Sequence, residues 1–373
     1  MAVDTQTHLL YIAHEGPGLV VAFDPIRGVV RWRVTLGNVA TDVQVDSNSH
    51  RVFVTANAYD RKEGDLFILD GATGQKLATL RTGLGDNGIA FDTQRHVIYV
   101  SSNDEGVVYV FTVQVGWQSG PIHVTSSKLS IGTHPQGLGV NSRLGRLYVA
   151  DVASHTLAVV DESNMHTLTT LQLARTPLQP LRVDEATGRV YIVCAGGQEL
   201  DIVDGNKNSI QARIPVAPYP EGVAFNTATG RIYVANEGDD EGGHVHDSGT
   251  TITVIDGKTF AVLGTLSVGK APDGVEADPA LRLVYVALED GGAVIEVSDS
   301  VNLSLQTKLE QGIVARNAIS SLQLATILTL IAMLLTVVWT TLDALLPRWR
   351  VRGSPQTPRG DASSHSEVHS LPQ

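Results

Sequence analysis

The sequence predicts an all-β fold, a seven-bladed β-propeller of four-stranded blades, followed by a single transmembrane helix. The first observation is a repeat: a short strand centred on an aromatic residue occurs seven times, with the aromatic residues 42 to 52 positions apart. Repeats of this length are typical of folds in which small units stack around an axis. The second observation is a 19-residue apolar run near the end of the chain. The aromatic strands cover residues 10–13, 52–55, 98–101, 147–150, 190–193, 232–235 and 284–287.

Each repeat contains the residues for four strands. In the second repeat, the aromatic strand is followed by an apolar run that ends on an acid, residues 66–70, then by a turn at 71–74 and a further run at 76–80. Another short run, such as residues 88–92, precedes the next aromatic strand. Runs of this kind, separated by Gly, Asn, Asp and Pro every 8 to 12 residues or so, indicate strands rather than helices. Four such strands make one propeller blade.

Three short patterns carry a family resemblance: the aromatic-Val-Ala strand, the later Val-Ile-Asp run and a Pro-x-Gly-Val lead-in. The lead-in occurs at residues 220–223 and again at 272–275. Together these patterns resemble the YVTN β-propeller repeats, a group related to the lactonase-like and NHL-type propellers, over about residues 2 to 310. The resemblance implies the fold but no single function, because such propellers serve as scaffolds, binders, lyases and lactonases.

The first repeat is shorter than the others at its beginning. Only residues 1–9 precede its aromatic strand, where other repeats have a full lead-in strand. We therefore expect blade one to take its inner strand from residues 317–321, near the other end of the chain. The alternative is a natural chain that begins further upstream and that carries an export signal there.

Composition excludes some classes of function. The net charge of −12 gives no basic surface of the kind that a nucleic-acid backbone requires, so nucleic acid is not expected as a partner. Cys194 is the only cysteine, which excludes an intramolecular disulfide and a thiolate metal cluster. Its apolar neighbours, residues 190–195, predict a buried thiol that acts as a small hydrophobic side chain.

Residues 324–342 predict the transmembrane helix. Ten of these 19 residues are Leu, Ile or Val and none is charged. At 1.5 Å per residue the helix would span roughly 28 Å, close to the hydrocarbon thickness of a bilayer. Trp339 and Trp349 suit the membrane interface, and three arginines follow between residues 348 and 352. By the positive-inside rule, these arginines place the C-terminus in the cytoplasm.

The chain therefore divides into a propeller at residues 1–315, a transmembrane region at 318–346 and a basic juxtamembrane segment with a disordered tail at 347–373. A cytoplasmic C-terminus after one membrane span predicts a single-pass membrane protein with an extracytoplasmic propeller. The first 20 residues show no signal peptide, so a cytoplasmic propeller on a C-terminal tail anchor is the alternative.

Polar residues precede the inner strands, where loops surround the mouth of the central channel. Oxygen donors from several blades would suit a divalent cation such as Ca²⁺, or a polyhydroxyl ligand. The competing interpretation is that these are solvated turn residues. The predicted mouth residues are Asp42, Asn87, Gln136, Gln179, Glu221 and Asp273, with Asn317 as a seventh.

The loop after the sixth aromatic strand is a second candidate site. His244 and His246 would lie on the same side of an extended loop, and with Asp247 they have the donor atoms for Zn²⁺ or another transition ion. The spacing matches no strict metal motif, and an exposed acidic loop is the alternative.

Two functions remain open. The first is a membrane-anchored scaffold that binds a protein or a small-molecule ligand, with no catalysis evident. The second is a metal-dependent hydrolase or lactonase-like enzyme, in which the mouth carboxylates hold a cation that polarises a carbonyl. The sequence contains no GxSxG, Walker, HExxH or helix-opening GxGxxG motif, so hydrolase and nucleotide sites of those types are not expected.

Overall fold

The computed structural model describes residues 1–14, 18–37, 39–57, 64–83, 85–114, 122–178, 180–238, 248–289 and 292–299. These residues belong to one compact unit, Met1–Leu303, and the unit Ser304–Gln373 lies outside them. In the part of the chain that is described, no helix is both long and apolar enough to cross a membrane. The predicted helix at 324–342 falls outside that part, and the predicted domain boundaries stay predictions.

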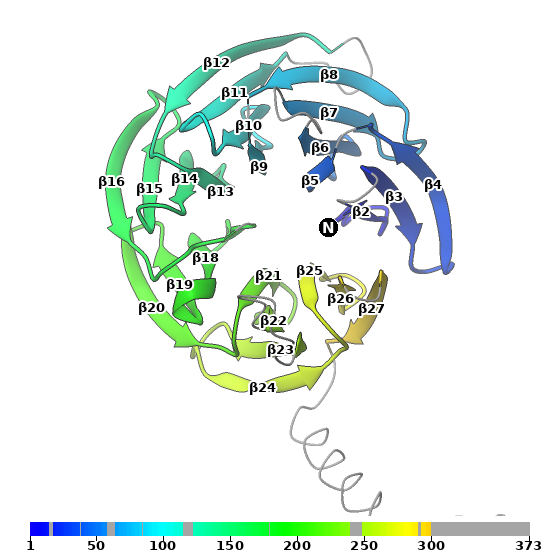
Figure 1. Cartoon of the computed structure of the whole chain (residues 1–373), viewed down its shortest axis with the longest axis vertical. Helices are drawn as coiled ribbons and strands as arrows, with labels where there is room; N and C mark the ends of the chain where they lie inside the picture. Colours follow the sequence, from blue (N-terminus) through cyan, green and yellow to red (C-terminus); the bar gives the residue numbers. More distant parts are fainter. Residues whose placement is uncertain are drawn as a thin grey trace, which may run out of the picture. The chain divides into compact units, whose positions relative to one another are not determined.

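The described residues form a seven-bladed β-propeller, as predicted (Figure 1). Each blade is an antiparallel sheet whose strands follow one another from the centre of the ring to its rim. Blades one to three comprise β1 (Ala2–Val3), β2 (Leu10–His14), β3 (Leu19–Asp24) and β4 (Val29–Thr35); β5 (Val39–Asp46), β6 (Arg51–Asn57), β7 (Gly64–Asp70) and β8 (Lys76–Thr82); and β9 (Asp86–Asp92), β10 (Val97–Ser102), β11 (Val107–Val113) and β12 (Val124–Ser130).

Blades four to six also have four strands, and blade seven has three among the described residues. Among the described residues, one 3-10 turn, Ala195–Gly197, lies between two strands. The strands are β13 (Pro135–Asn141), β14 (Arg146–Asp151), β15 (Thr156–Asp161) and β16 (His166–Gln172); β17 (Arg182–Asp184), β18 (Arg189–Cys194), β19 (Glu199–Asp204) and β20 (Ser209–Pro215); β21 (Pro220–Asn226), β22 (Arg231–Gly238), β23 (Ser248–Asp256) and β24 (Val262–Ser267); and β25 (Pro272–Asp278), β26 (Leu283–Leu288) and β27 (Ala293–Ser298).

The inner strand of blade one corrects one expectation from the sequence. The place beside β2 is taken by β1, in which Ala2 pairs with Tyr11 and Val3 with Leu10. Residues from the start of the chain therefore complete this blade, and residues 317–321 are not needed for it. Two residues suffice because both are buried, Val3 in a cluster with Leu10 and with Tyr285 of blade seven.

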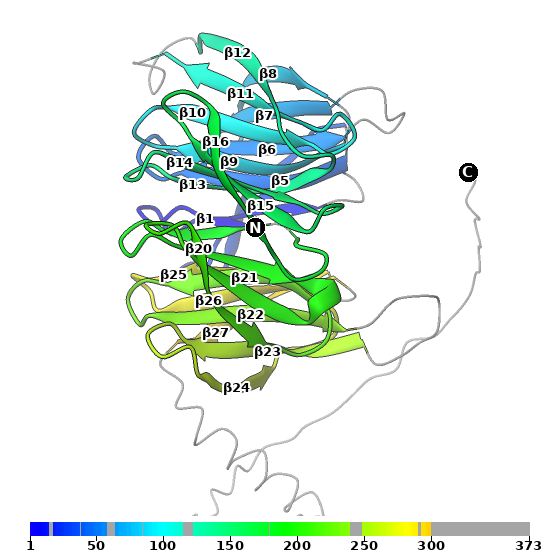
Figure 2. The same cartoon turned by 90° about the vertical axis from the view of Figure 1, so that its left-hand side faces the viewer.

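The strands run from one face of the ring to the other (Figure 2). At the back face, every inner strand ends in an Asp or Asn whose side chain accepts backbone N–H groups of the following turn. The fourth residue of each turn has a positive φ, and it is histidine in three blades. His8 bonds Asp278 of blade seven at 2.7 Å, and His50 bonds Asp4 of blade one at 2.6 Å, so the turns also connect neighbouring blades.

The repeated aromatic residues lie between blades. Tyr11, Tyr99, Tyr148, Tyr191, Tyr233 and Tyr285 are almost completely buried, as is Phe53. Where the hydroxyl has a partner, that partner is the turn after the third strand of the next blade: Tyr11 donates to the carbonyl of Gly71 at 3.1 Å and Tyr99 to the carboxylate of Glu162 at 2.9 Å. Gly71 has no room for a side chain, because a Cβ there would meet the Tyr11 hydroxyl.

Blades two and three depart from this pattern together. Blade two carries Phe53 at the aromatic position, and the third strand of blade three has Thr112 where blades one, two, four, five and six have an aspartate at the start of the turn. Phe53 packs against the ring of Phe91 in blade three, with centroids 4.9 Å apart. A ring without a hydroxyl needs no polar partner, so the two sequence departures compensate one another.

We expect Tyr99→Phe to lower the free energy of unfolding by about 1 to 3 kcal/mol, because it removes a donor from the buried Glu162 carboxyl. Tyr148→Phe is the matched control: its hydroxyl is buried and has no hydrogen-bond partner among the described residues, so its loss should leave stability unchanged or higher. Urea unfolding at pH 7 measures both. Equal effects of the two variants would contradict this account of the blade contact.

Candidate functional site

The predicted mouth residues Gln136, Glu221 and Asp273 lie at the front face, where the inner strands begin. In blades four, six and seven the pairing of the inner strand shifts just there, between Pro135 and Leu138, Pro220 and Val223, and Pro272 and Val275. Such a bulge takes a side chain out of the regular alternation and turns it away from the sheet. This is how the Pro-x-Gly-Val sequence presents its second residue at the channel mouth.

Two of the predicted mouth residues, Glu221 and Asp273, come together around a carboxylate that the sequence did not single out, Glu237 at the end of β22. The pKa of Glu237 is raised to about 8, chiefly by burial, then by a hydrogen bond with Glu221 and the charge of Glu221, and less by the charge of Asp273. A hydrogen bond with Glu289 acts in the opposite direction. We call Glu221, Glu237, Asp273 and Glu289 the front-face acids.

Asp42 occupies a different place from the other mouth residues. The pairing of β5 with β6 puts Val43 opposite Val54, so Asp42 stands where the other blades have the glycine of Pro-x-Gly. Its carboxylate accepts the N–H of Val43 at 2.7 Å and that of Ile89, in the next blade, at 3.0 Å. Burial raises the pKa of Asp42, an effect that these bonds and the guanidinium of Arg182 oppose.

An ion pair links the inner strands of two blades. Arg182 of β17 and Glu276 of β25 are 2.5 Å apart, although blade six lies between their blades. The Arg182 guanidinium also influences Asp42 in blade two. Charged side chains from blades two, five and seven therefore interact with one another, and the N-terminal ammonium group also acts on Asp42.

The other predicted site residues are not gathered into a site. Gln136 contributes its carbonyl, which accepts the Ser101 hydroxyl at 2.7 Å. Gln179, the side chain of Asn87, Asn317 and the predicted metal ligands His244, His246 and Asp247 lie outside the described residues. Within the described ranges, no group of three or more His, Cys, Asp or Glu side chains is arranged to hold a metal ion. Cys194 is buried, as predicted, and burial raises the pKa of its thiol.

The front-face acids can attract positive charge. Glu221 and Asp273 raise the proton affinity of Glu237, and a cationic group placed beside these carboxyl groups would relieve their repulsion. The sequence motifs did not predict Glu237 as a site residue, because Glu237 follows the sixth aromatic strand and the predicted mouth residues precede inner strands. The antiparallel pairing of β21 with β22 sets Pro220 opposite Asn236, so that Glu221 and Glu237 each lie one residue from that pair.

The fold is similar to solved propellers at low sequence identity. The β-propeller domain of Myceliophteria thermophila Cps50 (Swd1) matches with a TM-score of 0.64 and 10% identity, over 79% of this chain and 94% of that one. A chain in a crystal structure of the mitotic checkpoint complex matches with a TM-score of 0.62 and 11% identity, over 80% and 86%. No protein-family profile matches the chain, and no curated protein sequence does.

We expect Glu237→Gln to flatten the pH dependence of stability. The pKa of Glu237 rises from 4.5 to about 8 on folding, so the folded protein keeps a proton that the unfolded chain releases. The contribution is complete below about pH 4.5 and is lost as the pH rises to about 8. Melting temperatures from pH 4.5 to 8.5 measure it, with Glu296→Gln on exposed β27 as the control. Parallel curves for Glu237→Gln and wild type would refute the assignment.

Proposed function

We propose that the chain is a membrane-anchored β-propeller scaffold that binds a protein partner. A basic segment of the partner would bind at the front face of the propeller. The observation that carries the proposal is the set of front-face acids around Glu237, whose pKa of about 8 reflects burial and mutual repulsion. A lysine or arginine of a partner placed there would form charge-assisted hydrogen bonds and stabilise the ionised carboxylates.

The architecture suits this function. A propeller holds its sheets by contacts between blades, so the front-face loops can differ without changing the ring. The solved propellers of similar fold include a chain within a multiprotein complex, the mitotic checkpoint complex. We further propose that the repeats belong to the YVTN type, on the strength of the Pro-x-Gly-Val lead-in and the aromatic-Val-Ala strand.

The membrane anchor is proposed from the sequence. Residues 324–342 combine the length of a bilayer span with an absence of charge, and arginines follow them. An extracytoplasmic propeller follows from the positive-inside rule. The front-face acids would then be displayed outside the cytoplasm, where a soluble or neighbouring membrane protein can reach them.

The first experiment measures binding of a fluorescent octalysine peptide to the full chain in detergent, at low and moderate salt. We expect the variant E221Q/E237Q/D273N/E289Q to bind at least about 4 times more weakly, since exposed charge pairs contribute about 0.2 to 1 kcal/mol each and four of them are removed. The control E296Q/E310Q/D361N/E367Q removes the same net charge elsewhere and should keep wild-type affinity.

Equal losses in the two variants would mean that only net charge matters, which refutes a front-face site. The same preparations are titrated with Ca²⁺ by calorimetry. Stoichiometric Ca²⁺ binding that the front-face variant abolishes would favour the metal-dependent hydrolase over the scaffold, and lactone hydrolysis would then be assayed.

The second experiment tests the anchor. We expect the full chain to stay in the membrane pellet after alkaline carbonate extraction and a chain ending at residue 315 to be released, because a 19-residue apolar helix inserts stably. Release of both chains would refute the anchor.

A further inference from the structure

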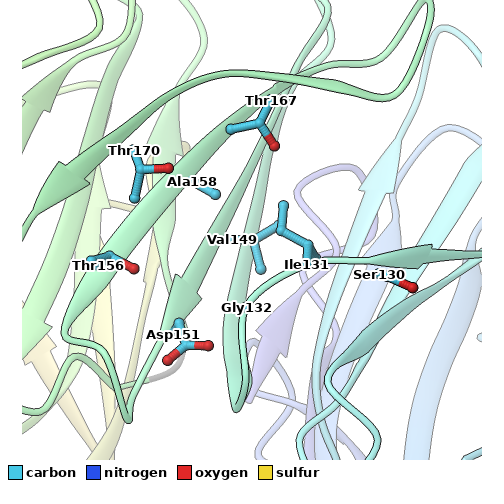
Figure 3. Close-up of a pocket in the computed structure, with 9 residues that line it drawn as sticks. All are labelled: Ser130, Ile131, Gly132, Val149, Asp151, Thr156, Ala158, Thr167 and Thr170. Atoms are coloured by element: carbon cyan, nitrogen blue, oxygen red, sulfur yellow. The ribbon is translucent and has the colours of Figure 1, made fainter.

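A cavity of about 270 Å³ lies between the last strand of blade three and blade four, and none of the front-face acids lines it (Figure 3). Ile131, Val149 and Ala158 provide apolar walls. Hydroxyl groups of Ser130, Thr156, Thr167 and Thr170 surround them, and Asp151 lies at one end (Figure 3). The cavity is large enough for the side chain of a lysine or arginine, since an engineered cavity of about 150 Å³ holds benzene.

The cavity exists because blade four has small residues where other blades have large ones. The pairing of the third and fourth strands puts Ala158 opposite Thr170. At the same positions blade three has Tyr109 opposite Lys128, and blade five has Asp201 opposite Arg213. In blade three, the Lys128 ammonium lies 4.5 Å from the centre of the Tyr109 ring and 2.9 Å from the Glu105 carboxylate.

Blades three and five place a cation of the fourth strand beside an acid of the same blade, and in blade five Arg213 lies 3.3 Å from Asp201. Blade two has such a pair two residues further along the strands, where Arg81 lies 3.3 Å from Asp65. Blade six has threonines at the two positions, and its Asn236 donates to Thr253 at 3.0 Å. Blade four has an acid beside the cavity, Asp151, and no cation is paired with it among the described residues.

Asp151 is a buried carboxylate, 3% exposed, that forms no ion pair with any described residue. Its oxygens accept the backbone N–H groups of Thr133, His134 and Ser154. Although burial opposes ionisation, these bonds lower the pKa of Asp151, so the group is charged at neutral pH. Gly132 lies so close that a Cβ there would collide with the carboxylate, which keeps this end of the cavity narrow.

We propose that this cavity binds the side chain of a lysine from a protein partner. The aliphatic stem would pack against Val149 and Ala158, the hydroxyls would accept ammonium N–H groups, and Asp151 would supply the balancing charge. Thr167 and Thr170 make no side-chain hydrogen bond to another described residue, so their oxygens are available as acceptors. No basic residue lines the cavity to compete. The proposal rests on the proposed binding of a basic protein segment and adds a second contact to it.

The test uses Nα-acetyl-lysine methylamide as the probe and the norleucine analogue, which has the stem without the charge. Binding to the full chain is followed by ligand-observed NMR. We expect saturable binding of the lysine probe, at least tenfold weaker binding of the norleucine probe, and at least tenfold weaker lysine binding by Thr170→Lys, which supplies blade four with its own cation. Thr265→Lys, at the equivalent exposed position of blade six, should bind as wild type does.

Melting curves confirm that both lysine variants fold. Equal binding of the two probes, or unchanged binding by folded Thr170→Lys, would overturn the proposal. Loss of the probe in E221Q/E237Q/D273N/E289Q would place the lysine at the front face, and so overturn the cavity site while supporting the proposed function. A third outcome separates the two sites in the other direction. If E221Q/E237Q/D273N/E289Q binds octalysine as tightly as wild type does, and Thr170→Lys no longer binds the lysine probe, the front-face site is refuted and the cavity site is supported.

Discussion

The ring depends on one contact that repeats around it: an aromatic side chain of one blade reaches the last turn of the next. Each aromatic is large enough to fill the gap between two twisted sheets, and the hydroxyl groups of Tyr11, Tyr99 and Tyr233 also find polar partners there. The turns provide these partners in different ways, with a carbonyl at Gly71, a carboxyl at Glu162 and a carboxyl at Asp299, which Tyr233 contacts. The amino-acid sequence of each repeat is therefore constrained at the aromatic residue and at the turn after the third strand. It is much less constrained in the loops of the front face.

This constraint explains why the fold could be predicted from the sequence. A motif that every blade must carry is visible as a period, and all seven aromatic strands lie where the period places them. The closure of blade one was mispredicted, because a strand of two residues leaves no pattern to read. What makes Ala2 and Val3 a strand is the surface that Tyr11 and Tyr285 offer them, which only the closed ring creates.

The candidate site was less predictable, because it depends on which strands are neighbours. Glu221 and Asp273 could be selected from their place in the lead-in motif, but Glu237 joins them through pairing across β21 and β22. Asp42 was aligned with them by sequence, and a shift of one residue in its register gives it a different environment. The cavity in blade four left no signal at all, since Ala158 and Thr170 are ordinary strand residues whose small size matters only beside blade three.

The meeting of the first and last blades has a mechanical consequence. Six junctions in the ring are crossed by the continuous chain, whereas blades seven and one, in the part of the chain described, meet through side chains such as Tyr285 with Leu10 and His8 with Asp278. Tension on the C-terminal side of the propeller would load this junction directly, because the described residues of the two blades are joined there by side chains alone. A pull from that side would therefore peel blade seven away first, leaving the other blades held to one another by the peptide backbone as well as by their cores.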